Sequence, residues 1–502
     1  MPASSMRKYM IIEGKERESV SGEWLEILNP ATGEVIGEVP AGTSEDVDVA
    51  VGAAKAAFDQ GPWPRMNAKG RAKALQRFAG AIEGNIVRLF QLETDNNGRP
   101  IIETRAQVGR LPEWFDYAAA LALAERTEVV PAGDGYLNYL QRFPLGVCGL
   151  LTPFNHPLMI LAKSLAPALA TGNSVVIKPS ELTPLTTLEL VRIAHESGIP
   201  EGVINVVTGV GATAGKSLAE HPDVAKVTFT GSTEVGRSIG AAAAARFART
   251  TMELGGKTPV IAFEDAGVER AAAGAAFGAF IAAGQTCICG SRLLVQRTIY
   301  DDFIEAFTRR ARAIRLGDPK EESTQMGPLI SARQRDRVDR YAALAEEEGA
   351  RITVGGKIPD MPSPLDRGFY FEPTVVAEAR NESRCAQEEI FGPIAVVVPF
   401  DDEVDALEKA NDIPFGLGSA IWTRDIARAH RVASGIQAGM VWVNDHHRLD
   451  PASPWGGVKA SGVGKEGGWE SFQDFTHVRS VFVRTETTDV DWYGDGEQRR
   501  LN

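Results

Sequence analysis

The chain has 502 residues and a formal net charge of −13, with 44% hydrophobic and 24% charged residues. This length predicts two or three domains, and this composition is typical of a globular protein rather than a disordered one. The acidic balance disfavours sequence-independent binding to nucleic acid or to an anionic membrane, because both need a basic surface. We therefore expect no nucleic-acid partner and no membrane partner.

The four cysteines are too few and too scattered for a disulfide framework. Cys287 and Cys289 form a C-x-C pair, but neither a second cysteine pair nor a nearby histidine completes a zinc set, so we expect no metal. The N-terminus lacks an apolar segment of signal-peptide length, and no run of 18 apolar residues occurs. The sequence predicts a cytoplasmic protein.

The first 125 residues divide into two parts. Short β-like pieces and turns occupy residues 1–40, and helical spacing begins at Ser44 and continues to about residue 125. A break in these helices is expected at Gly98-Arg99-Pro100. Residues 128–146 are then predicted to form a hairpin, with Pro131 and two glycines at its turn.

Strands and helices alternate from residue 147 onward. The predicted strands are 147–151, 174–178, 203–208 and 226–230, and helices begin near Pro157, Pro184 and Thr213. Such alternation predicts a doubly wound parallel sheet that binds a nucleotide. A second alternating region follows, with strands expected at 259–264, 293–296 and 440–444, helices at 301–314 and 332–348, and an extended tail strand at 476–484.

Two glycine patterns compete for that nucleotide. GVGATA at 209–214, which contains Gly211, fits a loose dinucleotide fingerprint, and a tight strand–helix turn explains it equally well. In FTGSTEVG at 229–236 the strand runs into Gly231, and Ser232 can cap the next helix. That arrangement leaves backbone donors and the positive helix end for a phosphate.

A thiol and an upstream carboxylate indicate covalent chemistry. Cys287, in GQTCICGSR at 284–292, follows residues 271–283, a predicted buried helix that ends in a turn. There it can meet unpaired N–H groups, which lower a thiol pKa from about 8.5; the alternative is a small core residue. Glu253, in MELGGK, adds a carboxylate beside flexible glycines, a combination that suits formation and hydrolysis of a thioester.

Several motifs occur together with these two. They are NPATGE at 29–34, TPFNHP with Asn155, KPSE at 178–181, EEIFGP at 388–393 and SPWGGVKASGVGKE at 453–466. In this order and at these distances they make nearly the whole chain resemble the aldehyde dehydrogenase superfamily, of the NAD-dependent hydrolytic type.

The resemblance implies an α/β fold with a doubly wound cofactor domain, an α/β catalytic domain and a small β oligomerisation arm. The corresponding segments are 1–127 and 149–254 for the cofactor domain, 255–444 for the catalytic domain, and 128–148 and 470–486 for the arm. The arm is expected to pair with the tail strand and to bridge subunits of a homodimer or homotetramer.

The resemblance also implies a mechanism, the oxidation of an aldehyde to a carboxylic acid through a thioester on Cys287. The Asn155 amide and the Cys287 N–H would hold the oxyanion. Glu253 would activate water, and its presence favours hydrolysis over transfer to a CoA thiol.

The cofactor contacts follow from the same motifs. Lys178 and Glu181 would contact the adenosine ribose, and because the Glu181 carboxylate would repel a 2′-phosphate, NAD is favoured over NADP. Glu389 and Phe391 would hold the nicotinamide end. The remaining expected contacts are Gly211, Phe229, Gly231, Ser232 and Leu254. An NADP-preferring semialdehyde dehydrogenase and an inactive binding relative remain the alternatives.

The substrate residues depart from the commoner pattern of the family. His156 and Lys163 stand where many relatives carry aromatic residues of an apolar tunnel, and Trp455 keeps that aromatic character. His447 and Arg448 add cationic capacity near the tunnel mouth, and an arginine there could grip a carboxylate. These residues suggest an aldehyde with an anionic or strongly polar group, in one form an aromatic or unsaturated semialdehyde. The alternative is that His156 only packs, Lys163 faces solvent and Arg448 makes a subunit contact.

Overall fold

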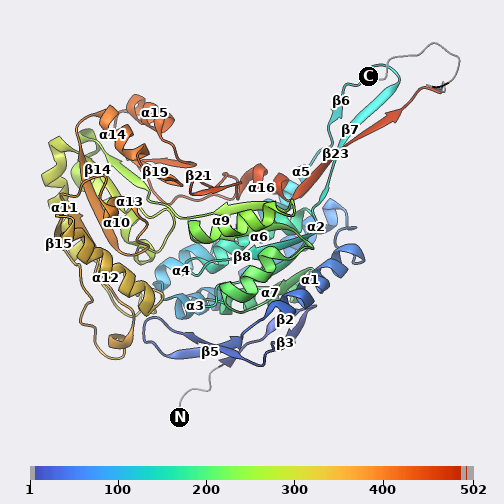
Figure 1. Ribbon diagram of the computed structural model, residues 1–502, viewed down its shortest axis with the longest axis horizontal. Helices are drawn as coiled ribbons and strands as arrows, with labels where there is room; N and C mark the ends of the chain where they lie inside the picture. The colour runs from blue at the N-terminus through green and yellow to red at the C-terminus, as the bar shows by residue number, and fades with distance from the viewer. Residues whose placement is uncertain (1–5, 488–492, 494–502) are drawn as a thin grey trace.

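The computed structural model describes residues 6–487 and Tyr493. Two helix-covered sheets lie side by side, and a narrow ribbon of strands projects from the molecule (Figure 1). Among the described residues, no helix is both long enough and apolar enough to cross a membrane.

The first sheet has eight strands. Their order is β22 (Gly462–Val463), β12 (Arg249–Glu253), β11 (Val224–Thr230), β8 (Val147–Leu151), β9 (Ser174–Lys178), β10 (Ile204–Val206), β2 (Met10–Ile12) and β3 (Lys15–Arg17). The strands from β12 to β10 pair in parallel. Within the parallel part, the chain starts at β8, extends the sheet through β9 and β10 on one side, and then through β11 and β12 on the other. A ligand cleft is expected at such a switch point, beyond the carboxyl ends of β8 and β11.

Helices cover both faces of this sheet. They are α1 (Ser44–Asp59), α2 (Ala68–Gly84), α3 (Ile86–Asn97), α4 (Ile101–Val108), α5 (Leu111–Ala124), α6 (Pro157–Ala170), α7 (Leu185–Glu196), α8 (Lys216–Glu220) and α9 (Thr233–Ala244). Alternate residues of β9 enter separate cores, Val175 and Ile177 on one face and Val176 on the other. The predicted helix break is confirmed, because Gly98 ends α3 with a φ of 79°, a conformation that costs glycine little.

The second sheet has seven strands and holds the largest apolar core. Its order is β15 (Arg351–Val354), β16 (Thr374–Ala377), β17 (Ile394–Phe400), β14 (Arg292–Gln296), β13 (Pro259–Ala262), β19 (Gly418–Trp422) and β20 (Met440–Val443). All of its pairings are parallel except that of β15. Its helices are α10 (Val268–Phe280), α11 (Tyr300–Arg312), α12 (Ala332–Glu347), α13 (Arg384–Gln387), α14 (Glu403–Asn411) and α15 (Ile426–Gly435).

The projecting ribbon is the predicted hairpin together with the tail strand (Figure 1). β6 (Val129–Val130) pairs with β7 (Tyr136–Pro144), and β7 pairs along its whole length with β23 (Thr476–Arg484), both antiparallel. The hairpin and its pairing with the tail are therefore confirmed. α16 (Gly468–Asp474) leads into β23. The smaller sheets are β1 (Met6–Arg7) with β5 (Val35–Pro40) and β4 (Trp24–Leu28), and β18 (Phe415–Gly416) with β21 (Val458–Lys459).

The helix expected at 271–283 is wrong at its end. α10 stops at Phe280, and Ala282, Ala283 and Gly284 then adopt φ values of 52°, 53° and 70°. Alanine has high helix propensity, so the composition of this segment predicted a longer helix. Tertiary contacts impose the left-handed turn instead, and it leads the chain to Cys287.

Candidate active site

Two cavities meet at the thiol of Cys287, which lines both of them. The first, about 570 Å³, is the strand-end cleft; it lies beyond β11 and β12 and is lined by Thr230, Ser232, Glu253 and Glu389 among others. The second, about 440 Å³, is the helix-lined cavity; its walls come from α4, α6 and α10 and from the loop around His447. The half-buried thiol is therefore reachable from two sides.

The turn before Cys287 is held in place by Glu103 of α4. Both carboxyl oxygens of Glu103 accept a hydrogen bond from the Ala282 N–H, each at 3.2 Å. One residue beyond the turn, the Gln285 side chain accepts from the Ile330 N–H at 3.0 Å. A carboxylate acceptor is a strong partner for a backbone N–H. These contacts stabilise two alanines in a backbone region that they rarely adopt.

Burial raises the pKa of the Cys287 thiol to about 12. Lys163 acts in the opposite direction, and the carboxyl groups of Glu253, Glu389 and Glu466 add to the increase. The expected lowering of this pKa is therefore wrong for the structure as it stands. The physical reason is that desolvation and nearby acidic groups outweigh one cation. The thiol needs a base to accept its proton.

Glu253 ends β12 and is buried beside this thiol. Neither of its carboxyl oxygens accepts a hydrogen bond of normal geometry from the described residues, and its polar neighbour is the Trp455 side chain, an interaction that lowers its pKa. Burial raises its pKa well above the usual range, and Glu466 adds to the increase, whereas Lys163 and Lys465 lower it. A carboxylate whose pKa is raised is a stronger base than a free one, so Glu253 is suited to accept a proton.

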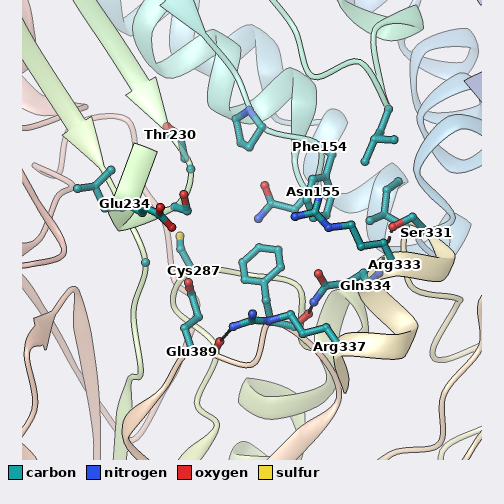
Figure 2. Close-up of a pocket in the computed structure, with 18 of the residues that line it drawn as sticks. Phe154, Asn155, Thr230, Glu234, Cys287, Ser331, Arg333, Gln334, Arg337 and Glu389 are labelled. Atoms are coloured by element: carbon teal, nitrogen blue, oxygen red, sulfur yellow. Dashed lines mark hydrogen bonds between the residues drawn. The ribbon is translucent and has the colours of Figure 1, made fainter. Parts of the chain in front are cut away.

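Asn155 lies in the loop between β8 and α6. Its Nδ2 donates to the Gln285 carbonyl at 2.9 Å, and its Oδ1 has no partner among the described residues. Asn97 holds the backbone by donating to the Asn155 carbonyl at 3.0 Å. Figure 2 shows Asn155 and Cys287 at the same cavity. The amide keeps a second N–H for another acceptor.

The strand-end cleft collects five of the expected cofactor residues: Gly231, Ser232, Leu254, Glu389 and Phe391. Ser232 caps α9 by accepting from the Val235 N–H at 3.3 Å. A Cβ atom on Gly231 would lie 2.4 Å from the Phe229 ring, so a residue with a side chain does not fit at this position. Glu389 accepts from the Gly256 N–H at 3.1 Å, and burial raises its pKa to about 7.

Four expected cofactor residues do not line this cleft: Lys178, Glu181, Gly211 and Phe229. Lys178 ends β9 and donates to Glu181 at 3.0 Å, so these two form an ion pair beside it. Gly211 begins the π-helical turn η1 (Gly211–Gly215) and is exposed. Phe229 lies beneath Gly231. The roles of these four remain predictions.

The opposite wall of the cleft carries arginines that the motifs did not indicate. Arg333, Arg337 and Arg340 lie on α12 and line the cleft, and Figure 2 shows Arg337 reaching to Glu389. Arg337 donates to the Glu389 backbone carbonyl at 2.6 Å. Their helical spacing places them on one face, and that spacing was the available sequence signal.

The helix-lined cavity contains four of the five expected substrate residues: His156, Lys163, His447 and Trp455. Lys163 does not face solvent; its Nζ lies 3.7 Å from the centre of the Trp455 ring and 3.8 Å from Glu466. Arg448 does not line the cavity, and its exposed side chain corrects the expectation of a carboxylate grip there. The physical reason is the turn after β20, in which His447 has a φ of 61° and occupies the inward position.

Sequence reasoning missed the polar wall of this cavity. Arg99, Glu103, Gln107 and Arg110 line it from α4 and the residues that flank that helix. Their spacing of three or four residues defines one helical face and was detectable. What the sequence did not show is that this face turns toward Cys287 rather than toward solvent.

Comparisons with known proteins match this architecture. A family model described as the aldehyde dehydrogenase family matches residues 17–481. Betaine aldehyde dehydrogenase of Bacillus subtilis is 40% identical over 484 residues, covering 94% of this chain and 98% of that protein. 5-Carboxymethyl-2-hydroxymuconate semialdehyde dehydrogenase of Escherichia coli is 43% identical over 443 residues, covering 88% and 93%. The chain belongs to the aldehyde dehydrogenase family.

A solved structure gives the same result at the level of the fold. PnpE of Pseudomonas sp. WBC-3, in complex with nicotinamide adenine dinucleotide, is 45% identical and superposes with a TM-score of 0.94, covering 97% of this chain and 100% of that one. The resemblance and the α/β fold inferred from the sequence are thus confirmed. The protein is an oxidoreductase that acts on aldehydes.

Proposed function

We propose that this protein oxidises an aldehyde to a carboxylic acid with NAD⁺ through a thioester on Cys287, which a water molecule activated by Glu253 then hydrolyses. The observation that carries the proposal is the position of Cys287, which lines both cavities. A thiol between two cavities can bind an aldehyde from one side while a hydride acceptor occupies the other.

The strand-end cleft fits a dinucleotide. It lies at the switch point of a doubly wound sheet, at the N-terminus of α9, where backbone donors favour phosphate. Arg333 and Arg340 add cationic groups on the opposite wall. When bound, the cofactor supplies the hydride acceptor. Ser232, Gly231, Glu389 and Phe391 are the residues that we propose to hold it.

Acylation requires a base and an oxyanion site. As Cys287 Sγ bonds to the aldehyde carbon, its proton passes to Glu253, the buried carboxyl group at the same cleft. Negative charge develops on the former carbonyl oxygen, where the second Asn155 Nδ2–H and the Cys287 N–H can donate. As this oxyanion collapses, hydride would leave the same carbon for the acceptor that the bound cofactor supplies, and the thioester on Cys287 would remain. Loss of one such donor typically lowers the rate about 10²- to 10³-fold.

Hydrolysis of the thioester uses the same carboxylate. Glu253 first releases the thiol proton to solvent and then takes a proton from water as the hydroxide attacks the thioester carbon. The C–S bond breaks, and the proton on Glu253 returns to the departing thiolate, which releases the acid and restores Cys287. Glu253 is suited to this step because, among the described residues, no cation forms an ion pair with it and its polar neighbour is the neutral Trp455 side chain. A base held in an ion pair would be less available.

NAD⁺ is preferred over NADP⁺ because Glu181 places a carboxylate where the adenosine ribose is expected. Lys178 engages one Glu181 oxygen, Oε2, which leaves the other available to accept from a ribose hydroxyl. The alternative is an NADP-preferring semialdehyde dehydrogenase, in which the positive charge of the same Lys178 would favour NADP⁺. The ratio of kcat/KM for the two cofactors separates these possibilities.

The ribbon of β6, β7 and β23 supports a homo-oligomer, a homodimer or homotetramer. Val129, Phe482 and Val478 are 67%, 64% and 48% exposed on it, an apolar surface that a second copy would cover. Light scattering after size exclusion measures the assembly. A cytoplasmic location is favoured because all four cysteines are free thiols.

The central test is formation of NADH from a panel of aldehydes, followed by absorbance and by identification of the acid product. We expect NADH and carboxylic acid in equal amounts, with no requirement for CoA. Production of an acyl-CoA only, or NADH formation that is unaffected by alkylation of Cys287, would contradict the proposal.

A further inference from the structure

The hydrogen bonds around His156 settle which of its ring nitrogens carries the proton. Gln107 Oε1 accepts from Arg99 NH1 at 2.8 Å, and arginine only donates, so the orientation of that amide is defined. The same oxygen lies 3.0 Å from His156 Nδ1. Nδ1 must therefore donate, and His156 Nε2 is an acceptor. Among the described residues, the hydrogen bond of this ring is the one at Nδ1, and the half-buried His156 lines the cavity.

A different contact determines which ring nitrogen of His447 carries the proton. Its Nε2 lies 3.2 Å from the Gly278 carbonyl, so Nε2 donates and Nδ1 is the acceptor. Among the described residues, the hydrogen bond of this ring is the one at Nε2, and the half-buried His447 also lines the cavity. Burial lowers the pKa of both histidines, that of His447 to about 4 and that of His156 well below its usual value, so both rings are neutral near pH 7. The cavity presents two acceptor nitrogens.

The cations of this cavity already have carboxylate partners. Arg99 contacts Glu93 and Glu103 at 3.4 and 3.3 Å. Arg110 contacts Glu113 at 2.8 Å. A substrate carboxylate would have to compete with these pairs, and it would face the lone pairs of two neutral histidines.

Lys163 also has a carboxylate partner, and in addition it covers an aromatic ring. It contacts Glu466 at 3.8 Å, and its Nζ covers one face of the Trp455 ring. That ring face is therefore not available to a quaternary ammonium group, which would need an open aromatic surface.

We propose that the substrate is an uncharged aldehyde that carries a hydroxyl or N–H group remote from the carbonyl, and that His156 Nε2 and His447 Nδ1 accept from this group. The inference rests on the proposed function. The rest of the substrate packs against Phe277, Ile281, Ile288 and Leu449, the apolar part of the same wall. A hydroxyl also accepts a hydrogen bond, and the free Gln107 Nε2 is a donor beside it.

The test compares matched aldehydes: meta- and para-hydroxybenzaldehyde, their methyl ethers, and the corresponding carboxybenzaldehydes and aminomethylbenzaldehydes. A methyl ether keeps the ring and the acceptor oxygen, but a methyl group replaces the donor hydrogen. We expect the hydroxyl compound to exceed its ether in kcat/KM by about tenfold or more for at least one isomer, because a buried acceptor left unpaired discriminates strongly. The carboxylate and the ammonium compound should both fall below the hydroxyl compound.

Two variants and one control locate the effect. His156→Phe and His447→Leu are each expected to bring the hydroxyl-to-ether ratio toward one, mainly through KM. Arg448→Ala, which changes an exposed side chain outside the cavity, is the matched control and is expected to leave the ratio within about twofold. Titration of the Cys287 thiol confirms that each variant is folded.

A wild-type ratio near one for both isomers, a preference for the carboxylate or the ammonium compound, or a hydroxyl preference that survives both histidine changes would overturn the inference. Each of these results leaves aldehyde oxidation itself intact. Failure of every aldehyde in the panel to reduce NAD⁺ would instead remove the proposed function, and the inference with it.

Discussion

The strand-end cleft and the helix-lined cavity share the Cys287 thiol but are built from different parts of the chain. In the cleft, Thr230 ends β11, and Ser232 and Leu254 follow closely on β11 and β12, so local motifs identify them. The cavity takes single residues from helix faces and from one distant loop. A cleft at strand ends can bind the same ligand in every member of a fold family. Residues on helix faces can be substituted singly without altering the fold, so the substrate that they contact can differ between members. We therefore expect cofactor chemistry to depend on the cleft and substrate choice on the cavity.

The largest expected effect is at the shared thiol. Cys287→Ser is expected to lower kcat by at least about 10⁴-fold, because serine is a far weaker nucleophile at this position. NAD⁺ binding, measured by fluorescence titration, is expected to persist. Cys289→Ser is the matched control; Cys289 is buried and its Sγ donates to the Ala279 carbonyl at 3.4 Å, away from the cleft lining. If Cys287→Ser were active and Cys289→Ser inactive, Cys289 rather than Cys287 would be the nucleophile.

Glu253→Gln is expected to separate acylation from hydrolysis. Steady-state turnover is expected to fall about 10²- to 10⁴-fold through loss of the base. A first burst of NADH is expected to remain, slowed but measurable by stopped flow, and mass spectrometry is expected to find the acyl group on Cys287. Absence of both burst and acyl-enzyme would mean that Glu253 acts chiefly in deprotonating the thiol.

The pH dependence follows from the same carboxyl group. Burial and the neighbouring Glu466 raise the pKa of Glu253, so its protonated form extends to a higher pH than that of a free carboxyl group. The basic form increases as pH rises, and the hydrolysis rate is expected to rise by at most about tenfold per pH unit until that pKa is passed. Single-turnover release of the acid measures this step alone. A hydrolysis rate that falls with increasing pH would be incompatible with a basic role.

The effect expected at the edge of the cleft is smaller. Glu181→Ala is expected to reduce the preference for NAD⁺ over NADP⁺ by about tenfold, because it removes a ribose acceptor and frees the Lys178 cation from its pair. The kcat/KM values for the two cofactors with one aldehyde measure this preference. The aldehyde selectivity of the variant is expected to stay unchanged. If aldehyde selectivity changed while the ratio of kcat/KM for NAD⁺ and NADP⁺ stayed constant, the proposal that the cleft binds the cofactor and the cavity selects the substrate would be contradicted.

The smallest effect is expected at Arg448. Replacement by alanine is expected to change kcat/KM by less than about twofold for both carboxylated and uncharged aldehydes, because the side chain is exposed and does not line the cavity. Parallel assays with the wild type measure it. A loss confined to carboxylated aldehydes would restore this arginine as a substrate contact.

Sequence patterns predicted the parallel strands well and the catalytic turn poorly. The strands at 147–151 and 174–178 match β8 and β9, because an apolar run between turn residues is a local property. The turn at Ala282 and Ala283 could not be predicted, because nothing in two alanines indicates a left-handed backbone. Its partner Glu103 is far away in the sequence, and only the fold brings its carboxylate to the Ala282 N–H.

The sequence by itself determined the fold class, the family, and the order of thiol, carboxylate and glycine-rich turns, since these depend on residues adjacent in the chain. The tertiary structure decided which charges are paired and which side chains face the thiol. Lys163 contacts Glu466 from a distant segment, and His156 acquires its tautomer from Gln107 and Arg99. Protonation and polarity in a cavity depend on burial and on partners across several elements, and these are determined only when helices and sheets pack together.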